Sequence, residues 1–134
     1  MQLEFDARIE NIGLLTGAVE ELLETLEAPM KACMQINVAI DELLSNICYY
    51  AYGDGVGKAY VTVETMPDKR GISITLEDEG EPFNPLSHED PDVTLGLDER
   101  GIGGLGIMLV KRTMDDVRYE YKNGRNRLTF VKTF

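Results

Sequence analysis

The sequence predicts an α+β fold, a two-layer sandwich in which helices cover one face of a mainly antiparallel sheet. Three segments carry apolar residues at helical spacing, and five shorter segments alternate apolar and polar residues as strands do. Short turns join four of the strand segments in pairs, and strands joined in this way run antiparallel. The order strand, helix, helix, two strands, helix, two strands favours helices that gather on one face of the sheet.

Each expected element follows from its own stretch of sequence. Leu3 and Phe5 alternate with polar neighbours in the first strand, and Pro29 separates the first two helices. The pair Asn123 and Gly124 is a strong hairpin signal between the last two strands. In chain order, the expected elements are a strand over 2–6, helices over 9–27 and 30–51, strands over 59–65 and 71–78, a helix over 104–114, and strands over 116–121 and 127–132.

The composition indicates a single acidic globular domain over residues 1–134. The chain has 24 acidic and 13 basic residues, a formal net charge of −11, and 43% hydrophobic residues. Such a charge repels nucleic acid and anionic lipid, so neither nucleic acid nor a membrane is expected as a partner. Cys33 and Cys48 have neither disulfide-framework density nor zinc spacing and are expected to be reduced. With no N-terminal signal pattern and no long apolar run, the sequence predicts a cytoplasmic protein.

Four glycines crowd into the stretch from Gly101 to Gly106, at the start of the third expected helix. Closely spaced glycines let a backbone approach a ligand, and a helix N-terminus offers unpaired N–H groups to an anion. The stretch is a candidate phosphate-binding loop, although a glycine cluster before a helix is often only a flexible connection. The acidic, proline-containing segment 79–100 before it is long for a compact domain and is either disordered or a functional lid.

Glu42 and Asn46 form a second candidate feature, on the second expected helix. They are four residues apart, so their side chains emerge one above the other on one helix face. Asparagine is a poor helix former, and its amide oxygen is a hard ligand that suits magnesium. Glu42 could then accept a proton from a water or hydroxyl nucleophile. The alternative is a solvated polar edge on an amphipathic helix.

Asp78 ends the expected strand 71–78 on its apolar face. Ile72, Ile74 and Leu76 share that face, and the alternation of side chains places Asp78 with them. A buried carboxylate needs a dedicated partner, and the exocyclic amine of a purine is one such partner. Gly80 would let the base approach the backbone. The alternative is an aspartate that only caps the turn into Gly80.

In this order, Glu42-x-x-x-Asn46, Asp78-x-Gly80 and the glycine stretch that ends at Gly106 resemble the three sequence boxes of the GHKL, or Bergerat-fold, ATPases. The chain is most similar to the bacterial anti-sigma-factor serine/threonine kinases and their stand-alone ATP-binding relatives. The resemblance spans nearly the whole chain, and it implies the same antiparallel sandwich that the periodicity predicts.

The resemblance also implies a binding site for ATP and Mg²⁺. By this resemblance Glu42 would be the general base, Asn46 the magnesium ligand, and Asp78 the partner of the adenine amine, with Gly80 along the base. Residues 79–102 would form an ATP lid. The remaining nucleotide-binding residues that the resemblance implies are Arg100, Gly103, Gly104, Leu105 and Gly106 at the phosphates and Thr129 on the adenine side.

The function that this resemblance implies is an ATP- and magnesium-dependent serine/threonine kinase that acts as an anti-sigma factor. It would bind a sigma factor, phosphorylate a serine on an anti-sigma-factor antagonist, and form a homodimer. The alternative is an ATP-binding switch that binds a partner protein without phosphoryl transfer, because nucleotide binding alone would use nearly the same residues. Glu42 favours the kinase, since a switch that only binds needs no base.

Two other kinds of protein fit the sequence poorly. The glycines from Gly101 to Gly106 match the Gly-x-Gly-x-x-Gly pattern of dinucleotide-binding folds, but an acidic loop precedes them where that fold has an apolar strand. This argues against NAD binding. The lysine, catalytic-loop and magnesium-binding motifs of eukaryotic-type protein kinases are also missing, so a kinase activity would use the different architecture described above.

Overall fold

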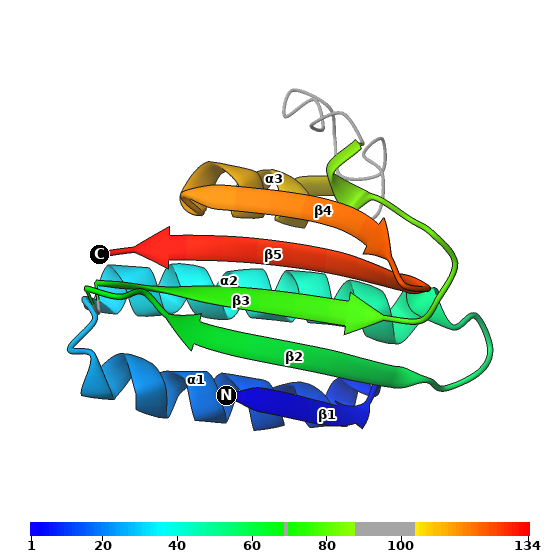
Figure 1. Cartoon of the computed structure of the whole chain (residues 1–134), viewed down its shortest axis with the longest axis horizontal. Coiled ribbons are helices and arrows are strands. Elements are labelled where there is room, and N and C mark those ends of the chain that lie inside the picture. The colour runs from blue at the N-terminus through cyan, green and yellow to red at the C-terminus, as the bar shows by residue number, and fades with distance from the viewer. Residues whose placement is uncertain (69, 88–103) are drawn as a thin grey trace.

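The computed structural model describes residues 1–68, 70–87 and 104–134, and within these residues it confirms the α+β sandwich (Figure 1). One layer is an antiparallel sheet and the other is formed by the α-helices, which lie behind the sheet in Figure 1. In chain order, the elements are β1 (Gln2–Asp6), η1 (Ile9–Asn11), α1 (Ile12–Thr25), α2 (Met30–Asn46), η2 (Ile47–Ala51), β2 (Lys58–Thr65), β3 (Gly71–Asp78), η3 (Pro85–Ser87), α3 (Gly104–Thr113), β4 (Asp116–Lys122) and β5 (Arg125–Thr133).

The described residues form a five-stranded sheet with the order β1-β2-β3-β5-β4, in which all neighbours are antiparallel. Both predicted hairpins are present, β2 with β3 and β4 with β5. Asn123 and Gly124 have φ angles of 55° and 76°, as a tight two-residue hairpin turn of primed type requires. The central strand β3 pairs with β2 on one side and β5 on the other, so its last residues are held between two strands.

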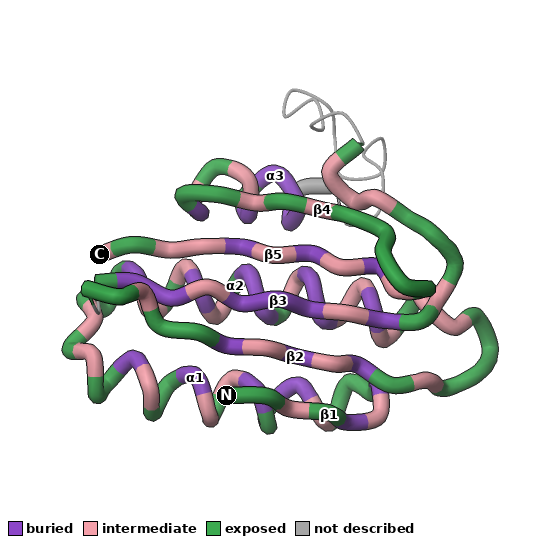
Figure 2. Tube along the Cα trace, viewed as in Figure 1, coloured by how far each residue is buried: buried purple, intermediate pink, exposed green. Residues whose placement is uncertain are grey.

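The hydrophobic core lies between the helices and the helix-facing side of the sheet (Figure 2). Alternate residues of β3 point into it, because successive side chains of a strand lie on opposite faces. A fully buried aliphatic side chain contributes about 1.5–3 kcal/mol, so this face stabilises the sandwich strongly. The fully buried side chains with the largest volumes are Phe130, Leu15, Leu23, Ile36, Ile40, Leu44, Ile72 and Ile74, followed by four valines.

The first predicted helix is shorter in the structure than its apolar pattern suggests. Residues 9–11 form the 3₁₀ turn η1, and α1 ends at Thr25. Glu27 has a φ of 56°, the amide of Ala28 donates to the carbonyl of Leu23, and the amide of Glu27 donates to that of Glu24. These bonds form a Schellman motif, which closes a helix with one left-handed residue. A glutamate occupies the position where glycine is usual, so no C-terminal glycine marks the end of this helix in the sequence.

The second predicted helix divides into two parts. α2 ends at Asn46, and the next five residues form the π-helix η2. A π-helix widens the last turn, because its hydrogen bonds join residues five apart. The widened turn brings the carbonyl of Ala51 against Gly80, beyond the end of β3. The end of the α2 segment is therefore packed directly on the chain that follows the central strand.

In the described residues, no helix combines the length and the hydrophobicity that a membrane crossing requires. Residues 79–87 of the predicted 79–102 lid lie within the described part and include the short turn η3. Residues 88–102 lie outside it.

Candidate functional site

A cavity of about 630 Å³ lies between the end of α2, the helix-facing side of β3 and β5, and the segment that follows β3. Its walls are mainly apolar and carry a few polar side chains. Such a cavity suits a flat heterocycle that is held by shape and oriented by one or two hydrogen bonds. The residues that line it are Leu43, Asn46, Ile47, Tyr50, Ala51, Leu76, Asp78, Glu81, Pro82, Phe83, Pro85, Tyr119, Asn126 and Leu128.

Asp78 lies in the wall of this cavity, on the buried face that the alternation predicts, and is 6% exposed. Its Oδ1 accepts hydrogen bonds from the amide N–H of Gly80 and from Nδ2 of Asn126, both at 2.9 Å. The sequence left open whether Asp78 caps a turn or faces a ligand. The structure combines the two, because Oδ1 caps the turn while the side chain lines the cavity.

Gly80 differs from its expected position. It is not among the cavity-lining residues, and the space that a side chain would fill is taken by the carbonyl of Ala51. A glycine is required here because a β-carbon would overlap backbone atoms of the π-helix η2. The structure therefore gives Gly80 a packing role at the turn after Asp78, in place of the expected approach to a base.

Asn46 lines the cavity at the C-terminal end of α2. Within the described part of the chain, the side-chain amide of Asn46 has no hydrogen-bond partner, which leaves its oxygen available to a ligand. The described residues contain no group of three or more acidic, histidine or cysteine side chains that could enclose a metal. A single amide oxygen is compatible with Mg²⁺, because this ion binds few protein ligands when phosphate oxygens and waters complete its shell.

Glu42 lies one helical turn before Asn46 and packs against α3. A β-carbon on Gly106 would overlap the carboxylate oxygen Oε2 of Glu42, so the two residues are in direct contact. Gly106 is the third residue of α3, and its backbone is buried. The contact places a carboxylate at the N-terminal turn of a helix, where the helix dipole is positive. Glu42 and Asn46 thus lie between the cavity and the start of α3.

The match to a family model covers residues 5–132, and the family is described as the histidine kinase-like ATPase domain. The chain belongs to this ATPase family. Three relatives are the serine/threonine-protein kinase BtrW of Bordetella bronchiseptica, the anti-sigma F factor of Clostridium perfringens and the serine-protein kinase RsbW of Oceanobacillus iheyensis. The kinase BtrW is 28% identical over 72% of this chain and 67% of its own length. The anti-sigma F factor is 26% identical over 98% of this chain and 94% of its own length. The kinase RsbW is 24% identical over 92% of this chain and 80% of its own length.

Membership of the histidine kinase-like ATPase family implies that the chain uses ATP. Of the residues predicted at the phosphates, Arg100 and Gly103 lie outside the described residues, while Gly104 and Leu105 are the first two residues of α3. Together with Gly106, these two place the N-terminus of a helix beside Glu42.

Thr129 does not line the cavity of this ATPase domain. Leu128 and Phe130 point toward the helices, so Thr129 between them points to the opposite face of the sheet. There its hydroxyl lies 2.9 Å from the hydroxyl of Thr75, and both threonines line a separate polar groove of about 570 Å³. The prediction of an adenine-side threonine at 129 is therefore not supported. The β5 residue opposite Asp78 is Asn126.

Of the residues that line the cavity, sequence reasoning predicted only Asn46 and Asp78 as ligand contacts. Among those it missed, four have aromatic or polar side chains that could contact a base: Tyr50, Phe83, Tyr119 and Asn126. Burial raises the pKa of the Tyr119 phenol, which keeps its hydroxyl protonated as a hydrogen-bond donor. The buried position of Asn126, although not its bonds, could have been found by extending the expected strand 127–132 back by one residue, because Asn126 then shares the apolar face with Leu128. The two aromatic residues at the mouth, Tyr50 and Phe83, come from η2 and from a segment without regular structure, for which a periodic pattern offers no signal.

Proposed function

We propose that this chain is an ATP- and magnesium-dependent serine/threonine kinase that acts as an anti-sigma factor and phosphorylates a serine on an anti-sigma-factor antagonist. The single observation that carries this proposal is the position of Glu42. Its carboxylate lies one turn from Asn46 and against Gly106 at the start of α3, next to a cavity that contains Asp78. The family match and relatives named as serine kinases and anti-sigma factors support the same function.

In this proposal the cavity holds the adenine and α3 receives the triphosphate. Asp78 accepts a hydrogen bond from the exocyclic amine. The first turn of α3 offers unpaired N–H groups and the positive end of a helix dipole to the phosphates, in a chain whose net charge of −11 otherwise repels them. Asn46 would hold Mg²⁺ together with phosphate oxygens, and the ion, when bound, neutralises charge on the phosphates.

Glu42 would act as the general base. It would accept the proton of the substrate serine as the serine oxygen bonds to the γ-phosphorus and the bond from that phosphorus to the ADP oxygen breaks. Phosphoryl transfer depends mostly on positioning and charge stabilisation, so a correctly placed carboxylate has a limited but real effect on the rate.

The proposal extends to organisation and partners. We infer a single ATP-binding domain over residues 1–134, with residues 79–102 as its lid. The proposed partners are a sigma factor, the antagonist protein and a second copy of the chain in a homodimer, and the proposed location is the cytoplasm. Relatives named anti-sigma F factor support the first two partners.

A transfer assay tests the kinase proposal. The purified chain is incubated with γ-labelled ATP and Mg²⁺ and with an antagonist protein captured from the source cell, and phosphoserine on the antagonist is measured. Labelled phosphoserine is the expected result. If ATP binds in calorimetry but no phosphoserine forms, the kinase proposal fails and the chain is a switch that binds ATP and a partner protein without transfer.

A further inference from the structure

Asn126 joins three separate parts of the molecule through one buried amide. It is 7% exposed and lies on β5. Its Nδ2 donates to Oδ1 of Asp78 at 2.9 Å and to the carbonyl of Glu81 at 2.8 Å. Its Oδ1 accepts from the amide N–H of Phe83 at 2.9 Å and from the hydroxyl of Tyr119 at 2.5 Å. Both protons and both lone pairs of the amide are therefore used.

The first consequence concerns Asp78. Oδ1 of Asp78 accepts two hydrogen bonds, one from Asn126 and one from the backbone of Gly80. Among the described residues, no group donates to the other oxygen, Oδ2. Oδ2 is not among the buried atoms that lack a partner, so it keeps some access to solvent on the cavity side. A carboxylate oxygen that is accessible and has no protein donor is suited to an N–H donor of a ligand in the cavity. Asn126 thus determines which oxygen of Asp78 remains for the ligand.

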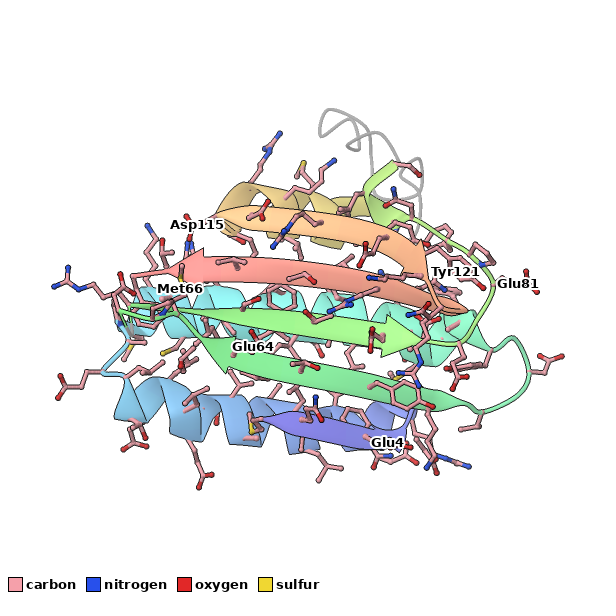
Figure 3. All side chains as sticks on the ribbon, viewed as in Figure 1. Glu4, Glu64, Met66, Glu81, Asp115 and Tyr121 are labelled. Carbon is pink, nitrogen blue, oxygen red and sulfur yellow. The ribbon has the colours of Figure 1, made fainter. Side chains whose placement is uncertain are left out.

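The second consequence concerns the wall of the cavity. Glu81, Pro82 and Phe83 line the cavity but belong to no helix or strand. Figure 3 shows Glu81 on the segment that leaves β3, at the end of the sheet where Tyr121 also lies. Backbone polar groups of such a segment need partners elsewhere, and Asn126 bonds the carbonyl of Glu81 and the amide of Phe83. One side chain thereby holds this wall at a fixed distance from Asp78.

We propose that Asn126 is a positioning residue that determines purine specificity in the nucleotide site. It reserves Oδ2 of Asp78 for the amine of adenine and fixes the 81–83 wall beside the base. Guanine carries a carbonyl oxygen at the corresponding position, which would face a carboxylate oxygen and be repelled. Tyr119 supports the amide by donating to its Oδ1. This inference rests on the proposed binding of an adenine nucleotide.

The test measures binding and not phosphoryl transfer. Titration calorimetry with ATP and with GTP is performed on the full chain and on Asn126→Ala, with a thermal melt of each. We expect Asn126→Ala to bind ATP at least tenfold more weakly and to lose at least tenfold in the ATP-to-GTP affinity ratio. Asn84→Ala is the matched control, because the Asn84 amide oxygen accepts from the N–H of Leu86 in the same segment and does not contact Asp78. The ATP-to-GTP affinity ratio of Asn84→Ala should stay within about twofold of the parent ratio.

A second variant covers the case in which Asn126→Ala does not fold. Asn126→Asp keeps the shape of the side chain but places two carboxylates together, which can bond only when they share a proton. Its ATP affinity should be low at pH 8 and rise as the pH falls, a pH dependence that the parent lacks. Thermal melts at each pH show where this variant is folded, because two adjacent carboxylates also destabilise the fold at high pH. A purely structural asparagine would leave the folded variant with the parent affinity at every pH.

Three outcomes overturn proposals, and they are distinguishable. A folded Asn126→Ala with the parent ATP affinity and ATP-to-GTP ratio overturns the role of Asn126, as does an Asn126→Asp variant whose ATP affinity follows the parent at every pH. A parent chain that binds neither nucleotide overturns the proposed nucleotide site itself.

Discussion

The carboxylate of Glu42 occupies the space that a side chain at Gly106 would fill. Glycine inside a helix costs about 0.5–1 kcal/mol relative to alanine, so a glycine at the third position of α3 has to be explained by a contact. The contact is with the end of a side chain from α2. Helix α3 and the proposed base are therefore positioned by each other, and Gly106 contributes to the site by leaving room for the Glu42 carboxylate.

The first prediction is that Gly106→Ala impairs transfer without unfolding the protein. The added methyl meets the end of a flexible side chain, so Glu42 shifts while the helix gains alanine propensity. Thermal melts should show an unchanged or higher Tm. The transfer rate should fall about 100-fold, because small displacements of a catalytic group cost this much. ATP affinity, measured by calorimetry, should change less than the rate.

Gly17→Ala is the control for this variant. Gly17 is in α1, and no atom lies within 4 Å of a β-carbon placed there. The control should gain similar helix propensity and keep the parent transfer rate. A folded Gly106→Ala that transfers phosphate as fast as Gly17→Ala would show that the position of the Glu42 carboxylate does not matter.

The second prediction concerns Gly80. A β-carbon there overlaps the backbone carbonyl of Ala51, which cannot rotate away as a side chain can. Gly80→Ala should therefore lower the free energy of unfolding by about 1–3 kcal/mol, the usual cost of overpacking. Urea denaturation followed by circular dichroism measures it, with Gly13→Ala as a control in open space on α1. Equal midpoints for Gly80→Ala and the parent would contradict the packing of η2 on Gly80.

The periodic patterns predicted the sandwich because the helical repeat of about 3.6 residues and the strand repeat of two residues decide which side chains face the core. Alternation placed Asp78 on the buried face of β3 correctly, since register in a sheet with one buried face leaves no other choice. The same rule, applied to β5, separates Asn126 from Thr129, because residues three apart in a strand lie on opposite faces. The assignment of Thr129 came from resemblance instead, and alternation contradicts it.

Other features could not have been predicted from local pattern. Asn126 bonds groups from β3, β4 and the 81–83 segment, and these meet only in the folded sheet. The π-helix η2 has the same apolar stripe as the α-helix before it, and its wider turn becomes evident only where Ala51 reaches Gly80. Tertiary contacts determine both features, so the periodicity of a single sequence does not predict them.

The third prediction is that Glu42→Gln separates binding from transfer. Glutamine keeps the shape of the side chain beside Gly106 but cannot accept the serine proton at neutral pH. ATP affinity should stay within about twofold of the parent, while the transfer rate falls about 10²–10⁴-fold, the usual effect of a general base. Single-turnover measurements with labelled ATP give the rate. Retained turnover would remove Glu42 from the role of base.

The fourth prediction is that Asn46→Ala removes the magnesium-dependent part of ATP binding. Asn46 lines the cavity, and its amide has no partner within the described residues, so alanine leaves no protein donor unpaired there. Calorimetry with ATP in Mg²⁺ and in EDTA measures the two affinities. In EDTA the variant should bind ATP with the affinity of the parent. In Mg²⁺ it should lack the increase in ATP affinity that the parent shows. An unchanged gain would exclude Asn46 as the metal ligand.

The last prediction concerns Asp115, at the opposite end of β4 from Tyr121 (Figure 3). Its Oδ2 accepts from the amide N–H of Thr133 at 2.6 Å and from the hydroxyl of the same residue at 2.9 Å. The bond from the amide N–H is the main cause that lowers the pKa of Asp115, with a further lowering by the hydroxyl. These bonds tie the end of β5 to the start of β4.

A carboxyl whose pKa is lower in the folded chain binds protons more weakly there than in the unfolded chain. Its stabilisation is therefore complete above the unfolded pKa of about 4 and is lost as the pH falls through the folded value. Asp115→Asn, which stands in for the neutral acid, should unfold more easily than the parent at pH 7 by at most about 1 kcal/mol, because the side chain is exposed and screened. Urea titrations should show this difference shrinking below pH 4, with Asp54→Asn, on an exposed turn, as the control for the lost charge. A difference that stays constant from pH 7 to pH 3 would contradict the carboxylate role of Asp115.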